Sequence, residues 1–163
     1  MAQICGGHGM LFTWHGAAYV LTEVRYCGYN NGMIRVPMRQ LGGEETDSIL
    51  KKKCAWILRV CASAGVTPVA IIAYGSAARN ELREDSDLDL AIIFRDAEAL
   101  RAGRSAVCSA KREDLWPPDL LFYTQGTFHS RANTGGVCMI IRDEGIVLYG
   151  SLGSPVDKVK HRS

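Results

Sequence analysis

The chain has 163 residues, of which 47% are hydrophobic and 22% are charged, and its formal net charge is +2. This length and composition are typical of one globular domain with a substantial core, and the net charge is too small to indicate a nucleic-acid-binding protein. The sequence has neither a long apolar run nor a secretory signal pattern, so we expect a cytoplasmic protein without a transmembrane helix.

Residues 1–44 contain turn-forming glycines and asparagines and no clear helical period. The pair Asn31-Gly32 suits a two-residue turn, which would join Tyr19–Tyr26 to Met33–Met38 in a β-hairpin. The alternative is a poorly ordered leader, which we favour because the rest of the chain forms a complete domain without it. We therefore expect an N-terminal extension over 1–44.

A helix is expected next, with Thr46 or Asp47 as its N-cap and Gly65 just after its end. Apolar residues between these points repeat at helical spacing. The run Lys51–Lys53 is expected on the solvated face of this helix. None of the six cysteines forms a C-x-x-C pair, which favours a reducing environment and no zinc site. The two on this helix, Cys54 and Cys61, are expected to face the core.

Two short apolar runs, Val69–Tyr74 and Leu88–Phe94, predict buried strands. The pair Gly75-Ser76 follows the first run. After ten intervening residues, Asp87 stands just before the second run and Asp89 within its start. Side chains at i and i+2 of a strand point to the same side, so the two carboxylates lie together. Such a pair suits Mg²⁺, which binds one or two protein carboxylates and completes its shell with water and phosphate oxygens.

The loop between the two strands has the chemistry of a phosphate site. Gly75 allows close approach of the backbone to a ligand, and Ser76 stands at the start of an expected helix, whose free N–H groups attract anions. That helix is expected over Ala77–Leu82. Within it, Arg79 either contacts a phosphate or pairs with Glu84 or Asp85. Loop and carboxylates together predict a site for a metal-bound nucleoside triphosphate.

Helices and strands alternate in the rest of the chain, which favours an α/β fold. The alternation ends near Gly150, and a polar, flexible tail is expected over 151–163. Gly103 weakens the middle of the first later helix by about 1 kcal/mol. The expected helices are Asp96–Arg112, Gln125–Thr134 and Val137–Arg142, and the expected strands are Asp119–Tyr123 and Ile146–Tyr149.

The pattern of Gly75-Ser76, ten residues and Asp87-x-Asp89 resembles the nucleotidyltransferases of the DNA polymerase beta superfamily, in particular the minimal nucleotidyltransferases. The resemblance covers about residues 45–150, which we take as one domain. It implies a nucleotidyltransferase fold of the α/β (α+β) class, with a mixed sheet of four to five strands and helices packed on one side. It also implies a third carboxylate on a later strand, a position that Asp119 matches; its alternative is a residue that caps the turn after two prolines.

The resemblance implies a chemistry as well. Two Mg²⁺ ions would be bound by Asp87, Asp89 and Asp119, the triphosphate of ATP or another nucleotide would lie at Gly75-Ser76 and Arg79, and AMP would pass to an acceptor hydroxyl. Stand-alone domains of this kind resemble antitoxins whose partner is a helical HEPN-type toxin, with a toxin tyrosine as acceptor. The alternatives are a small-molecule nucleotidyltransferase of the aminoglycoside type and a non-catalytic antitoxin. No nucleic-acid or membrane partner is expected, and a homo-oligomer stays open.

Overall fold

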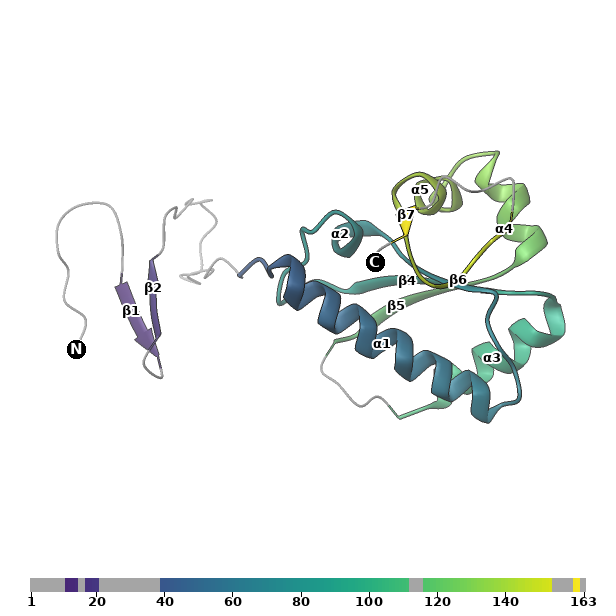
Figure 1. Ribbon diagram of the computed structural model, residues 1–163, viewed down its shortest axis with the longest axis horizontal. Helices are drawn as coiled ribbons and strands as arrows, with labels where there is room; N and C mark the ends of the chain where they lie inside the picture. The colour runs from purple at the N-terminus through teal and green to yellow at the C-terminus, as the bar shows by residue number, and fades with distance from the viewer. Residues whose placement is uncertain (1–10, 15–16, 21–38, 112–115, 154–159, 162–163) are drawn as a thin grey trace, which may run out of the picture. The chain divides into compact units, whose positions relative to one another are not determined.

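The computed structural model describes residues 11–14, 17–20, 39–111, 116–153 and 160–161 (Figure 1). The chain divides into two compact units, Met1–Pro37 and Met38–Ser163. In the first unit β1 (Leu11–Trp14) pairs antiparallel with β2 (Ala17–Val20). The hairpin expected from Tyr19–Tyr26 and Met33–Met38 falls largely outside the described residues.

The second unit is built on a five-stranded mixed sheet with the order β5-β4-β3-β6-β7. The central strand β3 runs antiparallel to both of its neighbours, whereas the pairs β4–β5 and β6–β7 are parallel. This confirms the predicted mixed sheet of four to five strands. The bounds are β3 (Ala70–Ala73), β4 (Leu88–Phe94), β5 (Pro118–Thr124), β6 (Ile146–Gly150) and β7 (Lys160–His161).

One outer strand corrects the expectation of a flexible tail over 151–163. Lys160 and His161 pair with Ile146 and Val147, so this part of the tail belongs to the sheet. β7 pairs with the edge of β6 that faces away from β3. The polar composition of residues 151–163 did not indicate this strand.

Five helices accompany the sheet in the described part of the chain, and two of them differ from expectation. The first begins earlier than predicted, after an N-cap at Gly42, and Thr46 is fully buried inside it instead of capping it. The expected helix over Ala77–Leu82 is a single turn placed earlier. The bounds are α1 (Gly43–Ser63), α2 (Gly75–Ala78), α3 (Ala97–Ser109), α4 (Gln125–Ala132) and α5 (Val137–Glu144).

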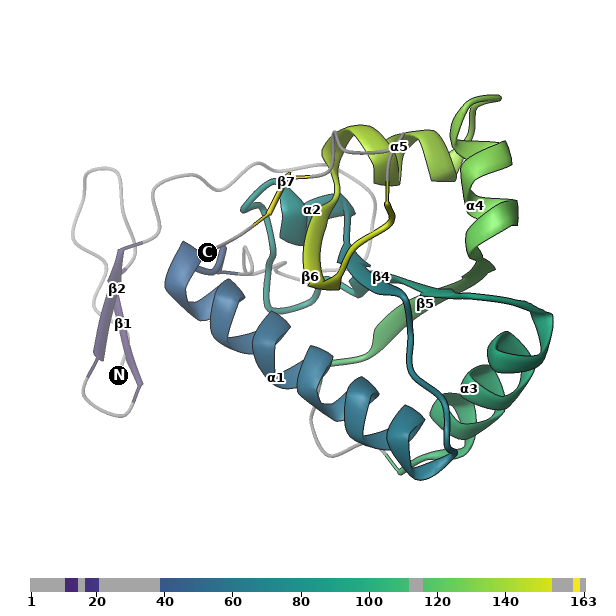
Figure 2. The ribbon, with the colours of Figure 1, turned by 45° about the vertical axis from the view of Figure 1, so that its right-hand side comes forward.

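The expectation that helices pack on one side of the sheet is wrong. Helices α1 and α3 cover one face and α4 and α5 cover the other (Figures 1 and 2). The reason lies in β3, where Ile71 packs in the first core and Ile72 in the second, both fully buried. A strand that is apolar at every position is buried on both faces. None of the helices in the described residues is long and apolar enough to cross a membrane.

The expectation of a solvated face for Lys51–Lys53 is wrong for its last member. Lys51 and Lys52 are exposed, but Lys53 is only 2% exposed. It lies one helical turn from the buried residues Leu50 and Ile57, so the helical period turns it toward the sheet. The predicted burial of Cys54 and Cys61 is confirmed.

Gly103 is needed for the packing of α3, although helix propensity alone disfavours it. A Cβ at this position would overlap the ring of Phe94, which is fully buried in β4. We therefore expect Gly103→Ala to lower the free energy of unfolding by about 1–3 kcal/mol. Gly126→Ala in α4, where a Cβ has open space, is the matched control and should gain up to about 1 kcal/mol. Urea unfolding measures both, and a Gly103→Ala variant more stable than the wild type would contradict the packing argument.

Candidate active site

Three aspartates meet at one end and on one face of the sheet. The parallel pairing of β4 with β5 sets Asp89 directly beside Asp119. Side chains alternate along β4, with Leu90 in the core under α1 and α3 and Ala91 in the core under α4 and α5. Asp89, and Asp87 two residues earlier, therefore lie on the α4–α5 face. We call Asp87, Asp89 and Asp119 the acidic row.

The acidic row comes together because of the strand register. In β5, Leu121 and Tyr123 pack in the α4–α5 core, so Asp119 lies on that face as well. Asp89 is partly buried, whereas Asp87 and Asp119 are exposed. The structure thus places the three residues that were predicted as metal ligands at one end and on one face of the sheet, open to solvent on one side.

The loop that ends β3 lies directly against this row. The Tyr74 amide donates to the Asp89 carbonyl at 3.1 Å. At Gly75, which has a φ of +64°, an added Cβ would overlap the Asp89 carboxylate oxygen Oδ2. A side chain is therefore excluded here both by the backbone conformation and by the carboxylate. Ser76 follows in α2, and its carbonyl accepts from the Glu81 amide at 2.8 Å.

Asp89 is affected by the charges of the other two aspartates in the acidic row. The pKa of Asp89 is raised above its ordinary value of 3.8, first by burial and then by the negative charges of Asp119 and Asp87. The guanidinium of Arg79 acts in the opposite direction. An Asp held beside two like charges in a partly buried place is typical of a site that receives a cation.

Arg79 lies near the row but has other partners than those considered from the sequence. It pairs with Glu81 at 2.9 Å and with Glu144 at 3.3 Å. The alternative pairing with Glu84 is wrong, since Glu84 pairs with Arg39 at 3.1 Å. About half of the Arg79 side chain is exposed, so these pairs contribute about 0–1 kcal/mol and a stronger anion can displace them.

The donor set fits a hard divalent cation. Among the described residues no three acidic, His or Cys side chains converge closely enough to hold a metal by themselves. Mg²⁺ does not need such a cage, because it takes one or two carboxylates from the protein and further oxygens from water and substrate phosphates. A cation between Asp89 and its neighbours would also relieve the repulsion that raises the pKa of Asp89.

Tyr74, expected only as the last residue of a strand, lies close to the acidic row. It is buried in the α4–α5 core, on the same face as the acidic row. Its pKa is raised by burial and by the charges of Asp89 and Asp119, so its hydroxyl stays protonated. The sequence could have indicated this placement, because Tyr74 lies two residues after Ile72 and side chains two residues apart on a strand point to the same face.

A comparison with protein families matches residues 54–148 to the family described as nucleotidyltransferase domain. The match covers more than half of the chain and includes the acidic row, Gly75-Ser76 and Arg79. A comparison with curated proteins found no match. The family match and the mixed sheet with the acidic row at the end of its adjacent strands agree, and the chain belongs to the nucleotidyltransferase domain family.

Proposed function

We propose that the chain is a magnesium-dependent nucleotidyltransferase of the adenylyl type, which moves AMP from ATP to an acceptor hydroxyl and releases pyrophosphate. Nucleotidyl transfer in general is the activity of its family. The observation that carries the proposal is the register of Asp89 beside Asp119, with Asp87 in the same row and Gly75 against the Asp89 carboxylate.

Each residue of the site has a defined task in this reaction. Asp87, Asp89 and Asp119 would hold two Mg²⁺ ions, which when bound neutralise phosphate charge and lower the pKa of the acceptor hydroxyl. Gly75 and Ser76 would hold the terminal phosphates, with Arg79 beside them. The acceptor oxygen forms a bond to the α-phosphorus, the bond from that phosphorus to the bridging oxygen of pyrophosphate breaks, and the acceptor proton leaves by way of Asp119 to water. Positioning and charge neutralisation supply most of the rate.

We propose a protein tyrosine as the acceptor, on a helical partner toxin of the HEPN type, which makes the chain an antitoxin. The resemblance to stand-alone minimal nucleotidyltransferases suggests this acceptor. Two observations support a large acceptor. Asp119 is exposed, and β5 is an outer strand of the described sheet. In addition, two cavities of about 240 Å³ and 250 Å³ in this unit are lined by residues other than the acidic row, so neither would enclose a small acceptor at the site.

AMP transfer from α-labelled ATP with Mg²⁺ tests the proposal, with a lysate of the source cells as acceptor. The control is the double variant Asp87→Asn/Asp89→Asn, together with a reaction in excess chelator. We expect a labelled protein band that is absent from both controls and whose label lies on tyrosine. Unlabelled CTP, GTP and UTP should compete less well than unlabelled ATP.

Other results would show which part of the proposal is wrong, the acceptor or the catalytic activity. Label in a small molecule or in RNA would keep the transferase and overturn the protein acceptor. If there is no label in any fraction and Mg²⁺-ATP does not shift the melting temperature, the catalytic proposal is wrong. The chain would then act as a non-catalytic binding module.

A further inference from the structure

The buried ammonium group of Lys53 needs an explanation that the site described above does not give. Its side chain is among the largest fully buried ones in the described residues. Removing an ammonium group from water costs free energy unless the protein supplies partners of good geometry. The partners of Lys53 therefore indicate what the charge does.

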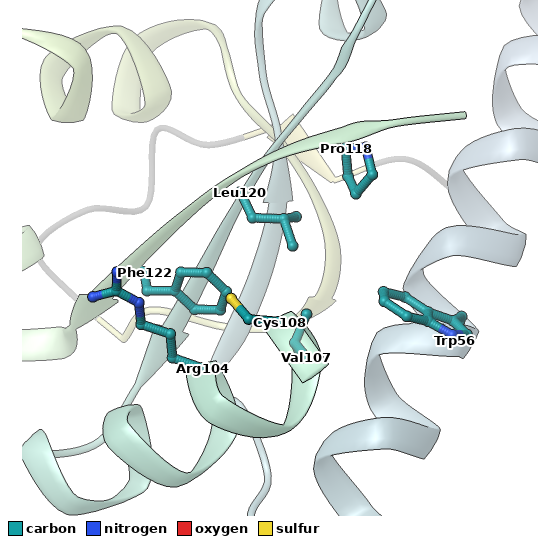
Figure 3. A pocket seen from close by; sticks show the side chains of 7 residues that line it. All are labelled: Trp56, Arg104, Val107, Cys108, Pro118, Leu120 and Phe122. Atoms are coloured by element: carbon teal, nitrogen blue, oxygen red, sulfur yellow. The ribbon is translucent and has the colours of Figure 1, made fainter. Parts of the chain in front are cut away.

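Two of these partners lie at the start of β5 and on α1. Lys53 Nζ donates to the backbone carbonyl of Trp116 at 3.0 Å, and it stands 5.4 Å from the centre of the Trp56 ring. An aromatic face at this distance attracts a cation. Trp56 lines the cavity between α1, α3 and β5 together with Pro118, and both side chains point into it (Figure 3). Lys53 thus connects α1 to the segment from Trp116 to Pro118.

Two prolines precede Asp119, which limits the backbone hydrogen bonds that the start of β5 can make. Pro117 and Pro118 have no N–H, so these two positions before Asp119 donate no backbone hydrogen bonds and offer only carbonyl oxygens. The Pro117 carbonyl accepts from the Leu88 amide at 3.1 Å. The Trp116 carbonyl accepts from Lys53. Both bonds hold the segment where β5 begins, at the end of its ladder with β4.

We propose that Lys53 is a positioning residue for Asp119. By holding the Trp116 carbonyl it fixes the start of β5, and with it the register that sets Asp119 beside Asp89. The consequence for catalysis rests on the proposed function, in which Asp119 binds metal, whereas the effect on the strand does not depend on it.

Hydrogen–deuterium exchange of the ligand-free full chain tests the effect on the strand. In Lys53→Met, which keeps length and packing but loses the charged donor, exchange of the β5 amides from Asp119 to Thr124 should be about tenfold faster. The α5 amides, Val137–Glu144, should be unchanged. The matched control is Lys52→Met, which alters an exposed neighbour and should leave both segments within about twofold of the wild type. Equal acceleration in β5 and α5, or none in β5, would overturn the proposal.

Calorimetric titration with Mg²⁺-ATP tests the consequence for the site. Lys53→Met should weaken binding by about 10–100-fold in the wild-type background. In the Asp119→Asn background it should weaken binding by no more than about twofold, because the carboxylate that it positions is already gone. A purely structural role would give the same loss in both backgrounds, and that result would overturn the proposal.

The two measurements separate this inference from the proposed function. If the wild type does not bind Mg²⁺-ATP, the proposed function fails, and the exchange experiment still decides whether Lys53 holds β5. If Lys53→Met does not fold, Lys53→Gln takes its place, because its amide is shorter and neutral and the same two results are expected.

Discussion

Asp89→Asn should abolish nucleotidyl transfer and at the same time make the ligand-free chain more stable. The loss of transfer should be at least about 10³-fold, because the charge stabilisation that a bound metal supplies is worth several kcal/mol and about 1.4 kcal/mol corresponds to a factor of ten. The gain in stability follows from the pKa of Asp89, which burial and the charges of Asp119 and Asp87 raise. The folded chain disfavours the ionised carboxylate, and an amide removes that penalty.

The pH dependence of the gain has a definite sign. Since the pKa of Asp89 is higher in the folded chain than in the unfolded one, its contribution is most favourable below the ordinary value of 3.8 and is lost as the pH rises through the folded pKa. Asp89→Asn should therefore raise the free energy of unfolding at pH 7 by about 0.5–1 kcal/mol. The gain is small because solvent screens the partly exposed carboxylate. It should shrink toward zero as the pH falls to the ordinary value.

Urea unfolding at several pH values, with and without Mg²⁺-ATP, measures this prediction beside the transfer assay. Asp85→Asn is the matched control, an exposed aspartate in the turn before the row, and should change neither quantity appreciably. Mg²⁺-ATP should stabilise the wild type and Asp85→Asn but not Asp89→Asn. A less stable Asp89→Asn chain without ligand, or one that keeps transfer within about tenfold, would contradict the electrostatic account of the row.

Gly75→Ala should damage both stability and transfer. Its φ of +64° costs an Ala about 1–2 kcal/mol, and the new Cβ would overlap the Asp89 carboxylate, so that Asp89 must move. We expect a total loss of about 2–4 kcal/mol in the free energy of unfolding. Transfer should fall by about 10²-fold or more, because a displacement of about 1 Å of a reacting group has this effect.

Gly153→Ala is the control that isolates the contact with Asp89. Gly153 has nearly the same backbone conformation, with a φ of +68°, but a Cβ there would have open space. It should lose only the backbone share of about 1–2 kcal/mol and keep full transfer. Thermal unfolding and the transfer assay on both variants give the comparison. Equal losses in the two variants would show that the carboxylate does not restrict position 75.

The strands of the sheet's centre and the position of Asp89 on one of them could be predicted because their signals are local. The apolar run Leu88–Phe94 became β4 with the same bounds, and the interruption of that run by Asp89 marked the residue that now lies beside Asp119. The helix expected from Asp96 became α3, and Asp96 is its N-cap, accepting from the amides of Glu98 and Ala99 at 3.0 Å and 2.9 Å. Periods, caps and interruptions are visible within about ten residues of sequence.

The features that could not be predicted depend on distant parts of the chain. Lys53 looked solvated because charged residues are mostly exposed, and its carbonyl partner lies 63 residues away. The second helical layer was missed because the resemblance implied helices on one side, although the unbroken apolar run Ala70–Ala73 is typical of a strand that is buried on both faces. Arg79 has carboxylates near it in the sequence, but its ion-pair partner Glu144 is distant in the sequence and lies beside it only in the folded chain.

The parallel pairing of β4 with β5 makes the site a product of folding. In the unfolded chain Asp87 and Asp89 are neighbours, but Asp119 joins them only when the connection through α3 has closed. A ligand that needs carboxylates from both strands therefore binds the native chain alone and stabilises it by mass action. At a free concentration 100 times its Kd it would add about 2.7 kcal/mol to the free energy of unfolding. The concentration of that ligand in the cell would then determine the protein's resistance to proteolysis as well as its reaction rate.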